Sequence, residues 1–165
     1  MKSIKHFKQK LQLKTLKVYS IARDTTLKNL KYPFIILQNS DVATGPGEHF
    51  TLWYGKNSRA PLIFFDSYGR SYSEYGFTTP IQARRVQENS GTFQHDSSKK
   101  CGLFCLFVAY YLLLGYKYEQ ILQKFCKVDL RHNDKMLLKF YNKFCHLIQT
   151  SGSKRNFCFS NKIML

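Results

Sequence analysis

Four residues of this 165-residue sequence have side chains that together could carry out acyl transfer: His49, Asp66, Gln94 and Cys101. A thiol can attack a carbonyl carbon once a histidine takes its proton, and a carboxylate can orient that histidine. A side-chain amide can donate a hydrogen bond to the developing oxyanion, which is worth roughly 3–4 kcal/mol of transition-state stabilisation. The order of the four residue types is more specific than any one of them. The sequence therefore predicts a nucleophile, a base, an orienting acid and an oxyanion donor.

The candidate nucleophile stands at a boundary in the hydropathy pattern. Residues 96–100 form a polar turn that leads into an apolar run from Cys101 to Gly115. Asp and Ser favour helix starts and Gly favours helix ends, which predicts a buried helix of about four turns with Cys101 in its first turn. The unpaired N–H groups and the helix dipole favour a thiolate there, and two lysines of the turn add positive charge. Cys105, one turn later, is expected simply to pack in the core.

Two strand-like runs are expected to bring the histidine and the acid together. His49–Tyr54 and Pro61–Asp66 are apolar and β-prone, and the residues between them have the composition of a hairpin turn. If the turn is centred between Asn57 and Ser58, His49 faces Asp66 with β-carbons about 4.5–5.5 Å apart. A slip of one residue would place the two side chains on opposite faces, so the pair depends on this register.

The rest of the central region is expected to form one further strand and a long loop. Tyr32–Gln38 is an apolar, β-prone run that ends in a turn. Residues 70–92 are polar and contain turn-forming residues, so we expect a loop with a short helix around Ile81–Gln87. Two helices are expected after the buried one, from Tyr118 to Cys126 and from about Leu130 to Gln149.

The whole chain, residues 1–165, is interpreted as a single domain with a basic segment at its N-terminal end and a tail at its C-terminal end. Residues 1–31 are expected to form a basic N-terminal helical segment, and the apolar spacing within 1–17 predicts an amphipathic helix with a lysine-rich face. That face is either an ordinary solvated surface or a contact for a polyanion, and no feature of the segment separates these two interpretations. Residues 151–165 are expected to form a tail.

The charge balance indicates a polyanionic partner. The chain has 26 Lys and Arg residues against 10 Asp and Glu, a formal net charge of +16 at pH 7. Such an excess attracts nucleic acid first, and an acidic protein or anionic membrane second. The five cysteines are odd in number and lack paired spacing, and the sequence has no secretory leader, which indicates free thiols in a reducing compartment. The apolar run Leu103–Leu114 is shorter than the roughly 20 residues needed to span a bilayer, so no membrane association is expected.

The motifs around the four candidate residues resemble those of a known family. GEHFTLWY, FFDSYG and QHDSSKKCGLFC are similar to the signature of adenovirus-type endopeptidases, a group of cysteine proteases that includes the SUMO-specific proteases. Similar proteases are encoded by large self-synthesising DNA transposons and related viruses. The motifs of this chain are most similar to those of the transposon and related viral proteases. The resemblance covers about residues 34–115. Phe50 stands where the family commonly has Trp, and Asp66 where the adenoviral enzymes usually have Glu.

The resemblance implies an α+β, papain-like (adenain-like) fold with a mixed central sheet and the nucleophile at the start of a buried helix. By motif, Cys101 matches the nucleophile, His49 the base, Asp66 the acid and Gln94 the oxyanion donor. The implied activity is endopeptidase processing of viral or transposon capsid or core precursors near small residues, typically Gly. The implied location is intracellular, in the host nucleus and the virion. The chemistry needs no metal or cofactor, and DNA and an activating peptide are implied as possible activators.

Three other functions remain open from the sequence. A ubiquitin- or SUMO-deconjugating protease would use the same four residues but needs a groove for a Gly-Gly tail. An acetyltransferase of the kind found among bacterial effectors would carry an acetyl group on the cysteine. A basic DNA-binding protein without catalysis would need no triad at all.

Overall fold

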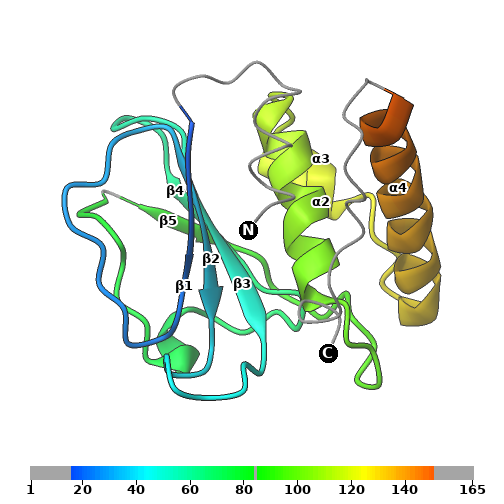
Figure 1. Ribbon diagram of the computed structural model, residues 1–165, viewed down its shortest axis with the longest axis horizontal. Helices are drawn as coiled ribbons and strands as arrows, with labels where there is room; N and C mark the ends of the chain where they lie inside the picture. Colours follow the sequence, from blue (N-terminus) through cyan, green and yellow to red (C-terminus); the bar gives the residue numbers. More distant parts are fainter. Residues whose placement is uncertain (1–15, 84, 151–165) are drawn as a thin grey trace.

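The structure is a computed structural model, and it describes residues 16–83 and 85–150. It contains a mixed five-stranded sheet in the spatial order β1-β2-β3-β4-β5, with helices on one side of it (Figure 1). The elements are β1 (Lys17–Ile21), β2 (Phe34–Asn39), β3 (Phe50–Gly55), β4 (Leu62–Phe65), a 3₁₀ helix η1 (Ser73–Tyr75), β5 (Val86–Glu88), α2 (Cys101–Leu113), α3 (Tyr118–Leu122) and α4 (Leu130–Thr150). The predicted α+β class with a mixed sheet is thereby confirmed.

The three central strands form an antiparallel meander, and one parallel strand is added at each edge. β2 pairs with β3 and β3 with β4 in antiparallel register, whereas β1 runs parallel to β2 and β5 parallel to β4. The predicted hairpin is therefore present as β3 and β4. Because β3 starts where β4 ends, the residues just before β3 and just after β4 lie at the same end of the sheet.

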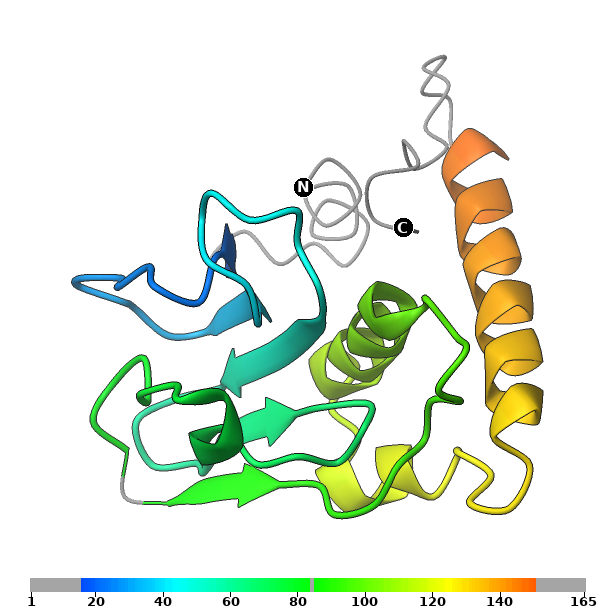
Figure 2. The same ribbon diagram turned by 90° about the horizontal axis from the view of Figure 1, so that it is seen from below.

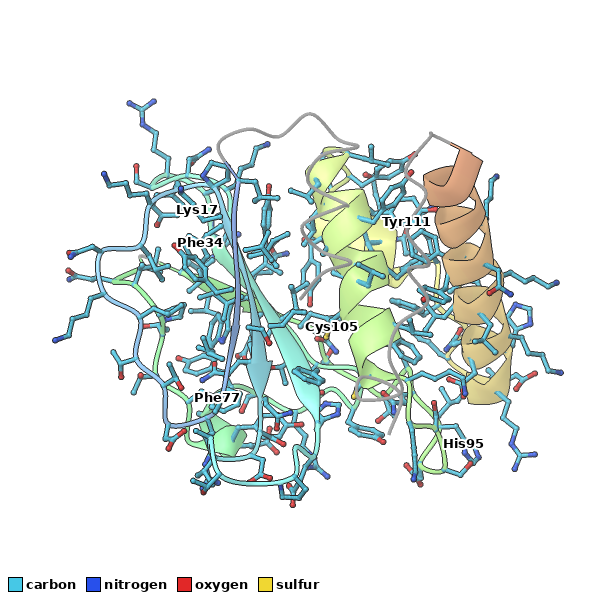
Figure 3. The ribbon with its side chains drawn as sticks, in the orientation of Figure 1. Lys17, Phe34, Phe77, His95, Cys105 and Tyr111 are labelled. Atoms are coloured by element: carbon cyan, nitrogen blue, oxygen red, sulfur yellow. The ribbon has the colours of Figure 1, made fainter. Side chains whose placement is uncertain are left out.

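Both faces of the sheet are buried, which explains why its strands are almost continuously apolar. Alternate residues such as Leu52 and Phe65 face the helices, while Trp53 and Phe64 face a second core. That second core is covered by side chains of the loops and of η1, including Phe77 and Tyr75. Figure 3 shows Phe77 on this side of the sheet and Cys105, a residue of α2, on the opposite side.

Helix α2 is the central element of the fold. It lies between the sheet and α4, and the view from below shows the same arrangement (Figure 2). Nine of its 13 residues are buried, which fits an apolar run with no polar face. The helix ends at Leu113, and Gly115 lies just past its end, as predicted, with a left-handed φ of 88°. The N–H groups of Gly115 and Tyr116 bond to the C=O groups of Leu112 and Tyr111, a Schellman motif that satisfies the last carbonyls.

The edge strands were not predicted. Within the predicted helical segment 1–31, the described part contains β1 at Lys17–Ile21, so that part of the prediction is wrong. The short helix expected around Ile81–Gln87 is also wrong, because Val86–Glu88 forms β5 against β4. Both strands are short and flanked by polar residues, and they gain their hydrogen bonds only from the neighbouring strand. The helix predicted for residues 1–17 and the tail at 151–165 lie outside the described residues, apart from residues 16 and 17.

The helices after α2 agree with the sequence in position, but α3 is shorter than predicted. It ends at Leu122 instead of Cys126. The chain turns there because Phe125 is inserted into the core between the sheet and the helices. Its ring contacts the rings of Phe65, Phe93, Phe104 and Phe107. No helix in the described part of the chain combines the length and apolar character needed to cross a bilayer.

Candidate active site at the start of helix α2

The end of the sheet where β3 starts and β4 ends brings His49 and Asp66 together. The pairing of Leu52 with Phe65 differs by two residues from the register predicted from the turn. That register was wrong, but a shift of two residues keeps every side chain on its own face, because side chains alternate with a period of two. His49 and Asp66 are therefore diagonal neighbours on one face instead of directly opposite. Their side chains still meet, with His49 Nε2 2.5 Å from Asp66 Oδ1.

The carboxylate of Asp66 is completely buried and its oxygens are fully used. Oδ1 accepts the hydrogen bond from His49, while Oδ2 accepts from the backbone N–H of Arg70 at 2.9 Å and from the hydroxyl of Tyr75 at 3.1 Å. Donors to both oxygens offset the cost of burying the charge. The carboxylate is thus held in one orientation, and it fixes His49 with Nδ1 facing away from it.

The backbone of Asp66 is held by Asn89, which follows β5. The Asp66 N–H donates to Asn89 Oδ1 at 3.0 Å, and Asn89 Nδ2 donates to the Asp66 carbonyl at 2.7 Å. The hydroxyl of Tyr118 donates to the same Asn89 oxygen at 3.2 Å. Asn89 is buried, and sequence reasoning missed it because it lies in a polar stretch interpreted as a loop.

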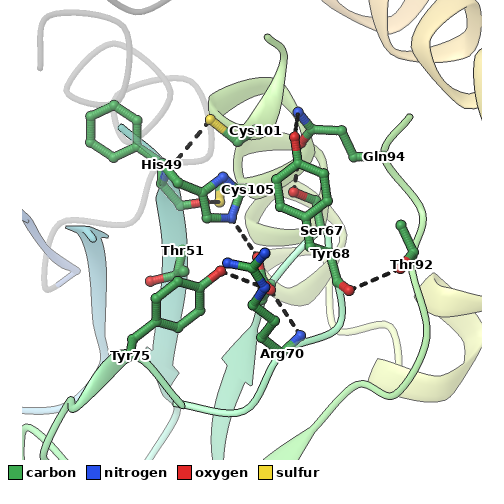
Figure 4. Close-up of polar contacts among 12 residues, drawn as sticks. His49, Thr51, Ser67, Tyr68, Arg70, Tyr75, Thr92, Gln94, Cys101 and Cys105 are labelled. Carbon is green, nitrogen blue, oxygen red and sulfur yellow. Dashed lines mark hydrogen bonds and ion pairs between the residues drawn. The ribbon is translucent and has the colours of Figure 1, made fainter. Parts of the chain in front are cut away.

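Cys101 is the first residue of α2, as predicted, and its sulfur lies beside His49 (Figure 4). The backbone N–H of Phe50 points to the Cys101 sulfur at 3.5 Å, and the His49 side chain is close enough to act on the pKa of Cys101. The residue is 8% exposed, so the sulfur is mostly enclosed. Lys100 is the N-cap residue and makes no side-chain cap, so the helix starts without a cap from the Asp and Ser residues of the polar turn.

The electrostatics of the pair favour a thiolate and an imidazolium. Burial alone raises the pKa of Cys101, but the hydrogen bond and charge of His49, with the backbone N–H groups of Phe50 and Gly102, lower it below its ordinary value. Burial lowers the pKa of His49, but the hydrogen bonds and charges of Asp66 and Cys101 outweigh it and raise that pKa from 6.5 to about 9. Both shifts favour transfer of the proton from the Cys101 sulfur to the His49 ring.

Gln94 lies near Cys101, close to the start of α2 (Figure 4). Its Nε2 donates to the backbone carbonyl of Ser98 at 2.7 Å and to the hydroxyl oxygen of Tyr68 at 3.1 Å. Its Oε1 accepts from the hydroxyl of Ser67 at 2.7 Å. The orientation of the amide is unambiguous, because a carbonyl oxygen can only accept and must face Nε2. The four residues predicted from the sequence therefore gather at one end of the sheet.

The loop that carries Gln94 is attached to helix α4. Asn133, which is fully buried, donates to the carbonyl of Phe93 at 2.9 Å. Asp134 accepts from the hydroxyl of Ser98 at 2.9 Å and pairs with Lys100 at 3.5 Å. The residues on both sides of Gln94 are thus fixed to the first turn of α4. This support was not predicted, because no local pattern links residues so far apart in the sequence.

Two tyrosines border the imidazole of His49. The Tyr68 ring centroid is 4.9 Å from the His49 ring, tilted by 35°, and the Tyr75 ring is 6.1 Å away and stacked at 21°. The Arg70 guanidinium lies near both, 5.8 Å from the Tyr68 centroid and 5.9 Å from that of Tyr75. Sequence reasoning missed these residues. The available signal was the occurrence of tyrosines in a polar, glycine-containing run directly after Asp66.

Comparison with known proteins adds no further information. No protein-family profile and no curated protein sequence matches the chain.

The thiols of Cys101, Cys105 and Cys126 are free. Within residues 16–83 and 85–150, no group of three or more His, Cys, Asp and Glu side chains is placed to hold a metal ion.

Proposed function

We propose that this protein is a cysteine endopeptidase with the papain-like fold of the adenovirus-type proteases. The observation that carries the proposal is the chain of contacts from Asp66 through His49 to Cys101, with 2.5 Å between His49 Nε2 and Asp66 Oδ1. A sulfur at a helix start beside a buried His–Asp pair is the arrangement in which a thiolate forms at neutral pH. A structural cysteine in a core has no need of such a pair.

The proposed reaction has an acylation step and a hydrolysis step. The Cys101 thiolate attacks the scissile carbonyl carbon, a C–S bond forms, and the carbonyl π pair moves to oxygen as an oxyanion. The oxyanion is stabilised on the side where Gln94 and the backbone N–H of Cys101 lie. As the intermediate collapses, the C–N bond breaks and His49 gives its proton to the leaving amine. Water then attacks the thioester, with His49 taking its proton, and the thiolate is released.

The proposed substrates are precursors of viral or transposon capsid and core proteins, cleaved next to small residues, typically Gly. The support is the motif resemblance together with the mostly enclosed sulfur. The proposed location is the host cell nucleus and the virion. An activating peptide is also proposed only from the resemblance, and no contact in the described residues bears on it.

The test is cleavage of a peptidyl-Gly-Gly-aminomethylcoumarin probe by the full chain. Release of fluorophore by the wild type and loss of release in Cys101→Ala is the expected result. Cys105→Ala is the matched control, because it removes a thiol one helical turn away. Equal activity of the wild type and Cys101→Ala would show that the cleavage comes from a contaminant. A di-ubiquitin or SUMO-conjugate substrate cleaved in preference to an unstructured Gly-Gly peptide would favour the deconjugating function.

We propose in addition that the protein associates with DNA, a role favoured by the charge of +16. In the described part of α4, Arg131, Lys135 and Lys139 are exposed and spaced four residues apart. Successive members of this basic ridge are thus separated by about 6 Å along the helix axis. Asp134 is the acidic residue near it, and it is already paired with Lys100. The ridge lies on α4, which is separated from the sheet by α2 (Figure 2).

Salt dependence tests this second role. For a fluorescein-labelled duplex followed by anisotropy, log K is expected to fall linearly with log salt, with a slope of about 0.9 per phosphate contacted. Neutralising the basic ridge with Arg131→Gln, Lys135→Gln and Lys139→Gln is expected to reduce the slope by about three contacts. The control removes the same charge elsewhere, with Lys28→Gln, Lys31→Gln and Lys56→Gln. A flat response to salt would exclude the role, and equal effects of both triple variants would exclude the ridge.

A further inference from the structure

The side-chain amide of Gln94 has both N–H groups engaged within the protein. One donates to the Ser98 carbonyl at 2.7 Å and the other to the Tyr68 hydroxyl oxygen at 3.1 Å. Its oxygen is held by the Ser67 hydroxyl at 2.7 Å. Gln94 is buried and all three of its polar contacts are made. To donate directly to an oxyanion, it would have to give up one of these bonds, and the weaker of the two donated bonds is the one to Tyr68.

The hydroxyl of Tyr68 differs from the Gln94 amide in how its hydrogen is used. Its oxygen accepts the bond from Gln94, and its own hydrogen has no acceptor among the residues that the structure describes. The residue is half-buried, so the phenol is accessible to a ligand bound beside His49. Burial raises the pKa of Tyr68 above its ordinary value, and the negative charges of Cys101, Asp96 and Asp66 raise it further while Arg70 lowers it. The phenol therefore keeps its proton at neutral pH and remains a donor close to the thiolate.

Tyr68 is also held in place from several directions. Its ring packs on the imidazole of His49 with 4.9 Å between centroids, and the Arg70 guanidinium lies 5.8 Å from its centroid. Its backbone carbonyl accepts from the hydroxyl of Thr92 at 3.0 Å. Gly69 completes the turn with φ of +76°, and a Cβ there would come within 2.5 Å of the Gly91 carbonyl oxygen. A donor fixed in this way needs little reorganisation when charge develops beside it.

We propose that the Tyr68 hydroxyl is the side-chain donor to the oxyanion, and that Gln94 is a positioning residue that acts through it. This inference rests on the proposed protease function and refines its oxyanion site. The Gln94 N–H bond to the phenol oxygen polarises the O–H group and makes it a stronger donor, since linked hydrogen bonds reinforce each other. The backbone N–H of Cys101 is the second donor, because the first N–H groups of a helix have no intrahelical acceptor.

In the reaction, Tyr68 hydrogen-bonds to the oxyanion without transferring its proton. When the Cys101 sulfur bonds to the carbonyl carbon, the π pair moves to oxygen, and the Tyr68 hydrogen faces that oxygen. When the intermediate collapses, the pair returns to carbon–oxygen bonding, and the proton needed by the leaving amine comes from His49. Tyr68 ends each step with its hydrogen in place.

The experiment compares Tyr68→Phe with the wild type in three measurements on the full chain. The first is kcat/KM for the peptidyl-Gly-Gly-aminomethylcoumarin probe. The second is the Kd of the peptide aldehyde acetyl-glycyl-glycinal, whose carbonyl carbon accepts the Cys101 sulfur and whose oxygen takes the charge. The third is the rate at which iodoacetamide alkylates Cys101, a displacement of iodide that forms no oxyanion. Tyr116→Phe is the control, because it removes a phenol hydroxyl at the far end of α2.

Tyr68→Phe is expected to lower kcat/KM by roughly 100-fold, mostly in kcat, which is the size of effect seen for one oxyanion donor. The aldehyde Kd should rise by at least roughly tenfold on the same argument. The alkylation rate should stay within a factor of about two, since the thiolate is formed by His49. Tyr116→Phe should match the wild type in all three.

Other results would overturn the inference. Unchanged or raised kcat/KM in Tyr68→Phe would show that Gln94 donates directly and that the phenol only occupies the site. A parallel loss of alkylation would show that the Tyr68 hydroxyl supports the reactivity of the Cys101 sulfur itself and not the oxyanion. In both cases the wild type still cleaves the probe, so the protease function stands. A wild type that neither cleaves the probe nor binds the aldehyde would overturn the protease function, and this inference with it.

Discussion

The first and second turns of α2 carry two buried cysteines whose pKa values are shifted in opposite directions. Cys101 and Cys105 are both buried, at 8% and 0% exposed, and both contact the backbone of Phe50. The Phe50 N–H points to the Cys101 sulfur at 3.5 Å, and the Cys105 thiol donates to the Phe50 carbonyl at 3.3 Å. The pKa of Cys101 is lowered from its ordinary value, whereas that of Cys105 is raised well above it.

The difference arises from the partners that each sulfur has. Burial is the largest effect on both thiols, and in both it raises the pKa. Cys101 also has the protonated His49 and N–H donors around it, which reverse the direction. Cys105 has the negative charges of Cys101 and Asp66 near it, which raise its pKa further, and the one backbone hydrogen bond that lowers it does not reverse the direction. The comparison indicates that a positive partner, and not the position on an apolar helix alone, lowers the pKa of a buried cysteine.

The largest expected effect separates the two cysteines directly. Cys101→Ala should reduce cleavage of the Gly-Gly probe by roughly 10⁴-fold or more, because the covalent route is removed. Cys105→Ala should keep near wild-type kcat/KM but lose about 1 kcal/mol of unfolding free energy, because it leaves a small cavity and an unpaired Phe50 carbonyl. Probe kinetics and urea unfolding measure the two effects. Loss of activity in Cys105→Ala without loss of stability would mean that the second turn also takes part in the chemistry.

The next effect concerns the source of the positive partner. Asp66→Asn removes the charge that raises the pKa of His49, so kcat/KM should fall by roughly 10²–10⁴-fold while the fold is retained. Tyr75→Phe is the matched control, since it removes one bond to the same carboxylate and leaves its charge. That variant should lose no more than a few-fold. Circular dichroism checks the fold, and unimpaired turnover in Asp66→Asn would identify Asp66 as the wrong acid.

The pH dependence follows from the same pair of groups. The thiolate of Cys101 forms as pH rises through its lowered pKa, and the proton on His49 is lost as pH rises through about 9. Because His49 must be protonated to release the amine, kcat/KM should be bell-shaped with its alkaline limb near pH 9. Asp66→Asn should move that limb to lower pH. An alkaline limb at the same pH in both proteins would show that Asp66 does not control the pKa of His49.

The smallest expected effect tests the attachment of the site to α4. Asp134→Asn weakens the contacts with Ser98 and Lys100 at a partly exposed position. Such pairs contribute about 0–1 kcal/mol, so kcat/KM should fall only a few-fold. Asn133→Ala should cost more in unfolding free energy, because it leaves the buried carbonyls of Phe93 and Cys126 unpaired. If Asp134→Asn reduced activity as strongly as Asp66→Asn, α4 would belong to the site itself.

The parts of this fold that could be predicted are those encoded by contiguous patterns. The buried helix from Cys101, its end at Gly115 and the β3–β4 hairpin follow from apolar runs and their flanking turn residues. The edge strands β1 and β5 could not be predicted, because three to five weakly apolar residues become strands only when a neighbour supplies hydrogen bonds. The hairpin register was predicted two residues away from the observed one, since the turn contains no Asn-Gly or similar pair to fix it.

The candidate site likewise has residues that could be predicted from the sequence and residues that could not. His49, Asp66, Gln94 and Cys101 were named from residue type and motif, and the structure places them at one end of the sheet. The residues that hold them in place were not named. Asn89 and Asn133 act through contacts to distant backbone groups, and Tyr68 through a ring and hydroxyl whose partners are set by the tertiary fold. Such roles leave no periodic signal in a single sequence.

The most direct test of the central claim, that the fold makes a thiolate of Cys101, is the pH dependence of iodoacetamide labelling at each cysteine, read by peptide mass spectrometry. We predict that Cys101 is alkylated at neutral pH much faster than Cys126, a half-buried free thiol, and that Cys105 stays unlabelled while the protein is folded. The rate at Cys101 should reach its plateau at a lower pH than the rate for free cysteine in solution. Labelling of Cys101 no faster than that of Cys126, with a plateau no earlier than that of free cysteine, would contradict the claim.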